Sequence, residues 1–300
     1  MRICFVYEYY FPHIGGGEIL IQRLAEGLVQ RGHQASLVTT LLPGTSRREQ
    51  INGVDIHRVA VPRVADRYWF TFLSYAKISR VSRDADIIQV ATYNGAVAAW
   101  AAARRGGKPV VLFPFEVLGS LWMNIGLNPL TATGFMLFEK IIMRLPYDGY
   151  SCISRYTMNS LLKASRIPEG KAFLAYPGID YDLFDPSSND RRDEIRSRLG
   201  VGDGTFLCIY TGRPGVVKGV EYLIKAAPEI QKRVPGARIL LLLSRRPANK
   251  YKEALALISK MDPDLFIIKE QVARNELPYY FQAGDCVVIP SLNEGFGFTC

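Results

Sequence analysis

Two series of alternating strand-like and helix-like segments, separated by one turn-rich stretch, constrain the fold of this chain more than any other feature. In the first series, the apolar strand-like runs are Arg2–Tyr7, Gln34–Thr40, Val54–Ala60, Asp86–Val90, Pro109–Phe113, Gly149–Ile153 and Lys171–Ala175. Apolar residues at helical spacing lie between most of them. Strands that alternate with helices predict mostly parallel sheets joined by right-handed crossovers.

The second series repeats the pattern. Its expected elements are the strand Thr205–Tyr210, the helix Val217–Val234, the strand Ala237–Leu243, the helix Ala248–Lys260, the strand Leu265–Ile268, the helix Arg274–Ala283 and the strand Asp285–Ile289. The chain stops soon after this last strand, so we expect the second domain to be incomplete.

The turn-rich stretch Pro177–Ser188 marks the domain boundary. After it, Asp190–Leu199 has the pattern of a short charged helix. We therefore predict an α/β protein of two Rossmann-like domains that face each other across a cleft. The predicted parts are residues 1–178, a linker with a short helix over 179–203, and residues 204–300.

The net charge of +9 is distributed unevenly between these parts. Residues 1–178 carry 20 Lys/Arg and 12 Asp/Glu, whereas residues 179–300 carry 17 and 16. The first domain is therefore expected to face an anionic partner or a membrane surface, the alternative being a basic surface that only aids solubility. The charge is not arranged on a nucleic-acid recognition motif, so no nucleic-acid partner is expected.

Two segments of the first domain combine basic or apolar residues with aromatic ones. Arg63–Arg83 interleaves five Arg and Lys residues with aromatic side chains, and Gly119–Pro146 is rich in Leu, Met, Phe and Ile. Such segments suit a membrane interface or a lipid-linked acceptor. The alternative is that they are helices that cover the sheet.

Membrane-spanning and secretory segments are not expected. No run of about 18 uninterrupted apolar residues is present, and the chain enters a strand at Ile3. The five cysteines show no C-x-x-C spacing, and four of them (Cys4, Cys152, Cys208 and Cys286) lie in apolar strand-like runs. We expect reduced core cysteines in a cytoplasmic protein, peripheral at most on the inner face of the membrane.

The turn Thr211–Gly219 is the first candidate binding site. It joins an expected strand to an expected helix and places Arg213 and Lys218 five residues apart between glycines. Two cations near a helix N-terminus suit a doubly charged anion such as a diphosphate, and glycines let the backbone approach it. The alternative is a solvated turn whose Arg and Lys merely flank a helix start.

A second glycine turn, Gly15–Gly17, lies between the first strand and the first expected helix. Strand, glycine loop and helix in this order open a nucleotide-binding type of α/β domain. The loop is not G-x-G-x-x-G and no acidic residue clearly ends the second strand, so a dinucleotide site is not expected. His13 lies beside these glycines.

Four motifs occur in a fixed order along the chain. They are Y-x-P-x-x-G-G-G-E at Tyr10–Glu18 with the R-G-H turn Arg31–His33, P-G-I-D-x-x-x-F at Pro177–Phe184, G-R-x-x-x-x-K-G at Gly212–Gly219, and E-L-P-x-Y-F-x-A-x-D-x-x-x-x-P-S-x-x-E-G-F-G at Glu276–Gly297. In this order and spacing, the chain resembles the retaining glycosyltransferases of family 4, which have the GT-B fold. The resemblance covers nearly the whole chain.

The resemblance implies a donor site in the second domain. Arg213 and Lys218 match the pair that holds the diphosphate of a UDP-, GDP- or ADP-sugar, and Glu294 matches a carboxylate near the donor sugar. A helix-cap role for Glu294 is the alternative. The further donor contacts implied are Gly212, Gly295, Phe296 and Gly297 in the second domain, and Gly16 and Gly17 in the first.

The resemblance also implies the reaction. A sugar would pass with retention from the nucleoside diphosphate to a hydroxyl of a glycan or lipid-linked acceptor, in cell-surface polysaccharide, lipopolysaccharide or glycolipid synthesis. Neither a cofactor nor a metal is implied. The D-x-D triplets at Asp84–Asp86, Asp180–Asp182 and Asp262–Asp264 are therefore expected to form turns and caps.

Two departures from the family pattern stand out. The second Glu of the family's E-x7-E motif would fall just beyond Cys300, and Phe115 occupies a position where the family often has a His. Glu116, next to it, is either an acceptor contact or a solvated loop carboxylate. His13, beside the glycines of the first domain, is likewise a candidate acceptor contact, the alternative being a loop residue without such a role. These departures motivate an alternative function, a catalytically inactive binder of sugar nucleotides or polyanions. A glycan phosphorylase or synthase of the same fold is a further alternative, but no candidate lysine for a phosphorylase's pyridoxal phosphate is evident.

Overall fold

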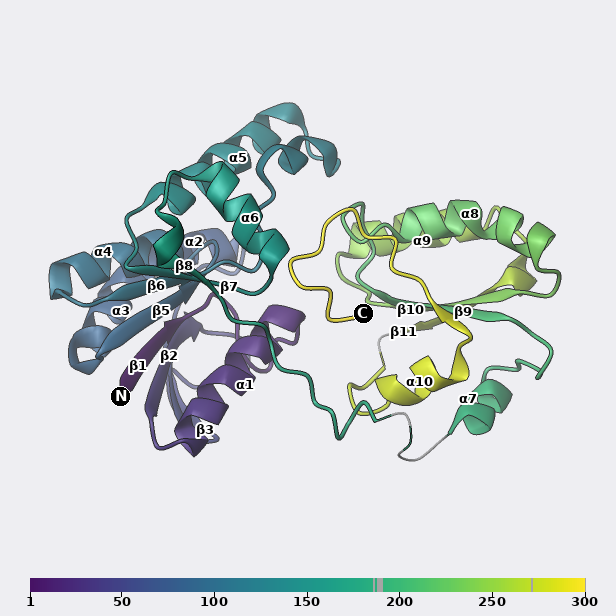
Figure 1. The fold of residues 1–300 in the computed structure, drawn as a ribbon, viewed down its shortest axis with the longest axis horizontal. Coiled ribbons are helices and arrows are strands. Elements are labelled where there is room, and N and C mark those ends of the chain that lie inside the picture. The colour runs from purple at the N-terminus through teal and green to yellow at the C-terminus, as the bar shows by residue number, and fades with distance from the viewer. Residues whose placement is uncertain (186, 188–190, 271, 300) are drawn as a thin grey trace. The chain divides into compact units, whose positions relative to one another are not determined.

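The computed structural model describes residues 1–185, 187, 191–270 and 272–299. The chain divides into two compact units, Met1–Pro177 and Gly178–Cys300 (Figure 1). Each unit is a parallel or mostly parallel sheet with helices on both faces.

Unit 1 is built on an eight-stranded sheet with the order β3-β4-β2-β1-β5-β6-β7-β8. The strands are β1 (Arg2–Val6), β2 (Gln34–Thr40), β3 (Arg48–Ile51), β4 (Val54–Val59), β5 (Ile87–Ala91), β6 (Val110–Phe113), β7 (Gly149–Cys152) and β8 (Ala172–Leu174). All neighbouring pairs are parallel except β3 with β4. The seven strands expected in this unit are therefore present, and β3 is an addition.

Strand β3 forms a hairpin with β4 that the alternation of strands and helices did not predict. Its two-residue turn is Asn52-Gly53, and both residues have positive φ, 49° and 83°. Such a turn matches the twist of the flanking strands, which is why Asn-Gly is a strong hairpin signal. The sequence thus held the signal, but the short polar strand before it did not resemble a buried one.

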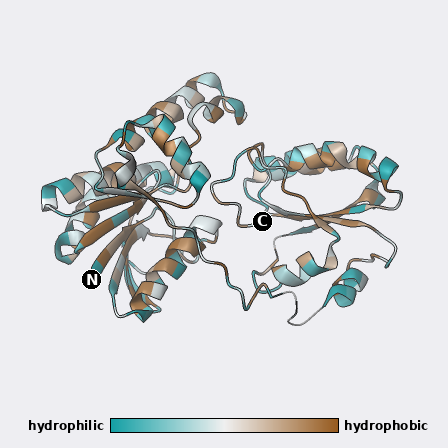
Figure 2. Ribbon diagram, viewed as in Figure 1, coloured by the Kyte–Doolittle hydropathy of each residue, from teal (hydrophilic) through white to brown (hydrophobic). Residues whose placement is uncertain are grey.

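Six α-helices of unit 1 cover the sheet, and its apolar core lies between helices and strands (Figure 2). They are α1 (Gly16–Gln30), α2 (Asp66–Leu73), α3 (Tyr75–Val81), α4 (Ala96–Gly106), α5 (Pro129–Arg144) and α6 (Arg155–Ala164). In α4, the small residues Ala96, Ala99 and Ala103 are fully buried, which lets the helix lie close to the sheet. Cys4 and Cys152 are buried in this core, as expected.

Unit 2 has a four-stranded parallel sheet with the order β11-β10-β9-β12. Its elements are α7 (Arg192–Arg198), β9 (Leu207–Gly212), α8 (Val220–Arg233), β10 (Arg238–Leu243), α9 (Ala248–Ile258), β11 (Phe266–Glu270), α10 (Leu277–Ala283) and β12 (Cys286–Val287). Helices α8 and α9 cover one face and α7 and α10 the other (Figure 1).

Two expectations for unit 2 were wrong in detail. Helix α8 begins at Val220 rather than Val217, because Gly219 before it adopts a left-handed conformation (φ 68°) that an α-helix cannot contain. Strand β12 is only two residues long, and its Cys286 is exposed rather than part of the core. Among the described strands, β12 pairs with β9 alone, so it lies at the edge of the sheet. Cys208 is buried as expected, and Cys300 lies outside the described residues.

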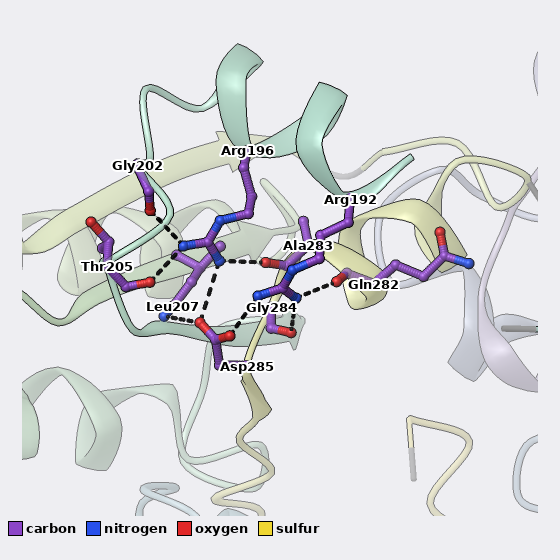
Figure 3. A network of polar contacts seen from close by, with 9 residues as sticks. All are labelled: Arg192, Arg196, Gly202, Thr205, Leu207, Gln282, Ala283, Gly284 and Asp285. Carbon is purple, nitrogen blue, oxygen red and sulfur yellow. Dashed lines mark hydrogen bonds and ion pairs between the residues drawn. The ribbon is translucent and has the colours of Figure 1, made fainter. Parts of the chain in front are cut away.

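Two arginines of helix α7 bind it to the rest of unit 2 (Figure 3). Arg196 donates to the carbonyls of Gly202, Thr205 and Ala283 at 2.6–2.9 Å, and it lies 3.3 Å from Asp285. Arg192 pairs with the same carboxylate at 2.6 Å. Burial by itself would raise the pKa of Asp285, but the Leu207 amide and the charge of Arg192 outweigh it and hold that pKa below its ordinary value.

Part of the segment that was expected to be a linker belongs instead to unit 2. The prediction gave residues 179–203 to a linker with a short helix, but Ile195, Leu199 and Val201 of this range are buried in the core of unit 2. The helix itself is confirmed as Arg192–Arg198, while Asp190 of the expected range lies outside the described residues. Unit 2 therefore includes the segment that precedes its first strand.

Candidate functional site

Each sheet has one point at which the chain changes the direction in which it adds strands. In unit 1, β1 has β2 on one side and β5 on the other; in unit 2, β9 has β10 on one side and β12 on the other. Ligands of open α/β sheets bind outside the carboxyl ends of the strands at such a point. The glycine turns 15–17 and 211–219 both follow strands that border these points, so each unit presents one candidate site.

In unit 2, the turns that follow β9 and β12 are joined through their backbones. The amide of Leu292 donates to the carbonyl of Val217 at 2.9 Å. A Cβ atom on Gly219 would lie 2.0 Å from the carbonyl oxygen of Pro290, and the residue has φ 68°. Both the close approach and the backbone conformation require glycine at this position.

Lys218 and Glu294 form an ion pair across these two turns. The Lys218 ammonium lies 2.8 Å from both carboxylate oxygens of Glu294, and the Ser291 hydroxyl donates to one of them at 2.6 Å. The two charged side chains are 33% and 29% exposed, so solvent and ligands reach both. The structure thus brings together two of the three predicted catalytic residues, and Ser291 is a partner that the sequence did not point to.

Arg213 lies at the start of the same turn with an exposed side chain. Its backbone is held by the Tyr210 hydroxyl, which donates to the Arg213 carbonyl at 3.1 Å. Burial raises the pKa of Tyr210, so this hydroxyl keeps its proton as a donor at neutral pH. Among the described residues, no hydrogen bond or ion pair holds the Arg213 guanidinium, which is left available to a ligand.

The turn after Glu294 contains the other predicted donor contacts, Gly295, Phe296 and Gly297. Gly297 has φ 82°, a left-handed conformation, and the Phe296 and Phe298 rings meet edge to face with centroids 5.1 Å apart. The structure therefore places these residues directly beside the Lys218–Glu294 pair in sequence and in the turn. Gly212, the last residue of β9, leads into the opposite turn.

In unit 1, the N-terminus of α1 packs closely against its sheet. Gly16 is the first helical residue, and a Cβ atom on Gly17 would lie 2.2 Å from the Tyr7 hydroxyl and 3.0 Å from the Phe115 ring. Phe115, at the position where the resemblance expects a His, packs edge to face on Tyr7 with centroids 5.5 Å apart. An apolar ring therefore borders this helix end where an imidazole was expected.

His13 lies beside the same helix end. Its Nδ1 atom is 3.0 Å from a carboxylate oxygen of Glu18, and its ring stacks on Tyr9 with centroids 4.6 Å apart. The buried Arg58 donates to the carbonyl of Phe11 at 2.6 Å and so fixes the start of this loop. The candidate acceptor contact thus lies between a carboxylate and an aromatic ring.

Glu116 is half-buried, and its carbonyl oxygen lies 3.0 Å from the Tyr93 hydroxyl. The segment around it is organised by Glu139 of α5, a residue that sequence reasoning missed. The buried Glu139 carboxylate accepts hydrogen bonds from the Leu118 and Gly119 amides, from Tyr93 and from Trp122, at 2.6–3.0 Å. The available signal was a lone acidic residue in an otherwise apolar and basic helix.

A second missed residue, Glu8, lies at the point where unit 1 changes the direction of strand addition. It follows β1, and Asn94, which follows β5, donates to its carboxylate at 3.4 Å. Burial raises the pKa of Glu8 to about 7, although the charge of Arg67 opposes this shift. Its second carboxylate oxygen is buried without a hydrogen-bond partner among the described residues.

Replacing Glu8 by glutamine should therefore stabilise unit 1 at neutral and higher pH. A carboxyl pKa raised from 4.5 to about 7 contributes its full stability below about pH 4.5 and loses it as the pH rises through 7. The difference in unfolding free energy between Glu8→Gln and wild type should grow to about 2–3 kcal/mol at pH 8. Thermal melts between pH 4.5 and 8 measure it, and a difference independent of pH would contradict the assignment.

Two of the three D-x-D triplets take the turn and cap roles that were expected, whereas Asp86 of the first triplet forms an ion pair instead. Asp262 caps a short 3-10 helix by accepting from the Asp264 amide at 3.0 Å, and Asp180 accepts from the Leu183 amide at 3.2 Å. Asp86 pairs with Arg2 at 3.1 Å. No group of three or more potential metal-ligating side chains was found in the part of the chain that the structure describes.

The two aromatic segments of unit 1 meet and expose apolar side chains. Tyr68 of α2 stacks on Phe135 of α5 with ring centroids 6.1 Å apart. The large exposed apolar residues of these segments are Val64, Tyr68, Trp69, Phe72, Leu73, Met123, Leu130, Leu137 and Ile141. Within the described residues, none of the helices combines the length and the apolar character needed to cross a bilayer.

Comparisons with known proteins match both units. The family model Glycosyltransferase Family 4 matches residues 14–183, and the model Glycosyl transferases group 1 matches residues 205–300. An uncharacterized glycosyltransferase of Methanocaldococcus jannaschii is 27% identical over 314 residues, which cover this chain fully and 77% of that protein. A D-inositol 3-phosphate glycosyltransferase of Xylanimonas cellulosilytica is 34% identical over 223 residues, 71% of this chain and 52% of that protein.

Solved structures share the fold at low sequence identity. Sucrose-phosphate synthase from Thermosynechococcus elongatus has a TM-score of 0.80 at 18% identity and covers 99% of this chain and 77% of its own. HepE of Anabaena, solved with UDP and glucose, has a TM-score of 0.76 at 19% identity and covers 100% and 77%. The shared fold is that of the GT-B glycosyltransferases. Since one family model alone spans more than half of the sequence and a second covers most of the remainder, this chain belongs to glycosyltransferase family 4.

Proposed function

We propose that this chain is a retaining glycosyltransferase that moves a sugar from a nucleoside-diphosphate donor to a hydroxyl acceptor without a metal ion. The observation that carries the proposal is the Lys218–Glu294 pair, held by the glycine turn at the point where the sheet of unit 2 changes direction. Arg213, exposed on the same turn, supplies a second cation. These two cations match the charge of a diphosphate.

The ion pair suggests how the donor is bound. The diphosphate would take over the Lys218 ammonium from Glu294, because two phosphates offer more negative charge than one carboxylate. Glu294 would then be free to accept hydrogen bonds from hydroxyls of the donor sugar. Preset cations favour the transition state, since charge grows on the leaving diphosphate as the sugar departs.

Retention would follow from displacement on one face of the sugar. The bond from the anomeric carbon to the phosphate oxygen breaks, and a bond to the acceptor oxygen forms on the same face. The acceptor proton passes to the departing phosphate oxygen, so that the step needs neither a protein nucleophile nor a separate base. The residues of unit 1 near the α1 N-terminus, His13 and Glu116 among them, would hold the acceptor.

The first substrates to test come from similar proteins. HepE was solved with UDP-glucose and with UDP and glucose, and several sequence relatives carry the name D-inositol 3-phosphate glycosyltransferase. We propose UDP-glucose as the first donor, with GDP- and ADP-sugars beside it, and D-inositol 3-phosphate as the first soluble acceptor. Glycan and lipid-linked acceptors for surface polysaccharide, lipopolysaccharide or glycolipid synthesis complete the panel.

The decisive experiment measures release of the nucleoside diphosphate with each donor, with and without acceptor and in the presence of EDTA. Carbon-13 NMR of the product reports the anomeric configuration. We expect acceptor-dependent turnover, an unchanged rate in EDTA and retained configuration. Calorimetric donor binding without transfer or hydrolysis would instead favour an inactive sugar-nucleotide binder, and inverted configuration would contradict the mechanism.

We also propose that unit 1 contacts a membrane surface peripherally, on the cytoplasmic side. The support is the exposed apolar set of α2 and α5, joined by the Tyr68–Phe135 stack, together with the excess of basic residues in this unit. Phe72, 72% exposed, is the central test residue on α2. Phe72→Ser should reduce co-sedimentation with anionic vesicles several-fold, and equal sedimentation of both proteins would contradict the contact.

A further inference from the structure

Unit 1 contains a cavity of about 390 Å³ lined by Arg144, Arg166 and Ile167. Arg144 is the last residue of α5, and Arg166 follows the end of α6. We propose that this cavity binds the phosphate of an anionic lipid headgroup while the exposed face of α5 rests on the bilayer. The proposal deepens the membrane contact proposed above and does not depend on sugar transfer.

The exposed apolar residues of α5 lead to this cavity. Leu130, Leu137 and Ile141 are 85%, 52% and 58% exposed. Their spacing of 7 and 4 residues places them on one side of the helix, and Arg144, three residues after Ile141, continues the same side. If this apolar side of α5 enters the boundary between headgroups and acyl chains, the Arg144 guanidinium at its end would lie at the level of the headgroup phosphates.

The charge around the cavity favours an anion. Helices α5 and α6 carry four basic residues and one acidic residue, and the acidic one, Glu139, is buried and bonded to backbone amides. Arg144 and Arg166 have no ion-pair partner among the described residues. Both arginines line the same cavity, and a guanidinium donates paired N–H bonds to a phosphate.

A lipid is the occupant that accounts for both features. A free phosphate or a soluble phosphoester would use the two arginines but leave the apolar residues of α5 in water. An anionic lipid uses the arginines for its headgroup and the apolar residues for its interface. The apolar row and the paired cations on the same helix therefore favour a bilayer.

The test is co-sedimentation of the whole chain with vesicles of phosphatidylcholine alone or with 30% phosphatidylglycerol (roughly the anionic content that attracts basic segments). Arg144→Gln/Arg166→Gln should bind the anionic vesicles about tenfold more weakly than wild type. Lys140→Gln/Lys163→Gln removes the same amount of charge from α5 and α6 outside the cavity and should weaken binding less. Arg144→Lys/Arg166→Lys keeps the charge but loses the paired N–H geometry, so it should also bind more weakly.

Three results would overturn the proposal. One is an equal loss of vesicle binding in Arg144→Gln/Arg166→Gln and in Lys140→Gln/Lys163→Gln. Another is vesicle binding at the wild-type level by Arg144→Lys/Arg166→Lys. Either result would show that surface charge alone explains the binding. The third is that calorimetry detects binding of inorganic phosphate that depends on Arg144 and Arg166, but the wild-type protein does not co-sediment with either kind of vesicle. Thermal melts confirm that each variant is folded, and donor turnover, measured separately, reports on the proposed enzyme activity alone.

Discussion

Substituting Lys218 by alanine is expected to lower kcat/KM for the sugar-nucleotide donor by about 10²–10³-fold. The ammonium lies on the turn that faces the expected diphosphate and is held 2.8 Å from Glu294 until the donor arrives. In the proposed mechanism, its loss removes a charge that acts most strongly on the leaving group in the transition state. The measurement is steady-state release of the nucleoside diphosphate with the donor that the wild type uses.

The control for this prediction is Arg233→Ala. Arg233 is also paired with a glutamate, at 2.8 Å from Glu229, but it is the last residue of α8, at the helix end far from the turn. Its loss should leave the donor kinetics within about twofold, since exposed pairs contribute little. Arg213→Ala should resemble Lys218→Ala. If Arg213→Ala and Lys218→Ala both turn over normally, the donor site has been misplaced.

Substituting Gly219 by alanine is expected to cost unit 2 about 2–5 kcal/mol of unfolding free energy and to abolish most of the transfer activity. The methyl group would lie 2.0 Å from the Pro290 carbonyl oxygen, and φ 68° is unfavourable for any residue with a Cβ atom. Relief requires the two turns to separate, which also separates Lys218 from Glu294. Urea unfolding measures the first effect and donor kinetics the second.

Gly236→Ala is a matched control for this prediction. Gly236 has φ 79°, but a Cβ atom there would meet nothing within 4 Å. It carries the conformational cost alone, about 1–2 kcal/mol. The difference between the two variants isolates the contact between the turns. Equal destabilisation by both substitutions, with activity kept in each, would show that the close approach to Pro290 is not essential.

Much of the fold followed from local patterns in the sequence. Buried parallel strands are short apolar runs, and helices repeat apolar residues every three or four positions, so both can be recognised within ten residues. The positions of the glycine turns followed in the same way. The β3–β4 hairpin was not predicted, although Asn52-Gly53 is a typical hairpin turn, because its outer strand Arg48–Ile51 is polar and half exposed. An edge strand does not carry the apolar signature of a buried one.

The candidate sites were predicted only in part. The residue types and spacing of Arg213, Lys218 and Glu294 indicated an anion site, but the Lys218–Glu294 pair joins residues 76 positions apart. Likewise, Asn94 reaches Glu8 across 86 positions. Such contacts depend on the order of strands in the sheet, which no short window of sequence contains.

The sequence by itself determined the alternation of strands and helices, the two glycine turns and the family to which their motifs point, because each depends on residues close together in the chain. Only the tertiary structure decided that the turns after β9 and β12 touch at Gly219, that Lys218 is paired with Glu294, and that the segment before β9 belongs to unit 2. These features arise where strands distant in sequence become neighbours, and packing rather than local preference selects those neighbours.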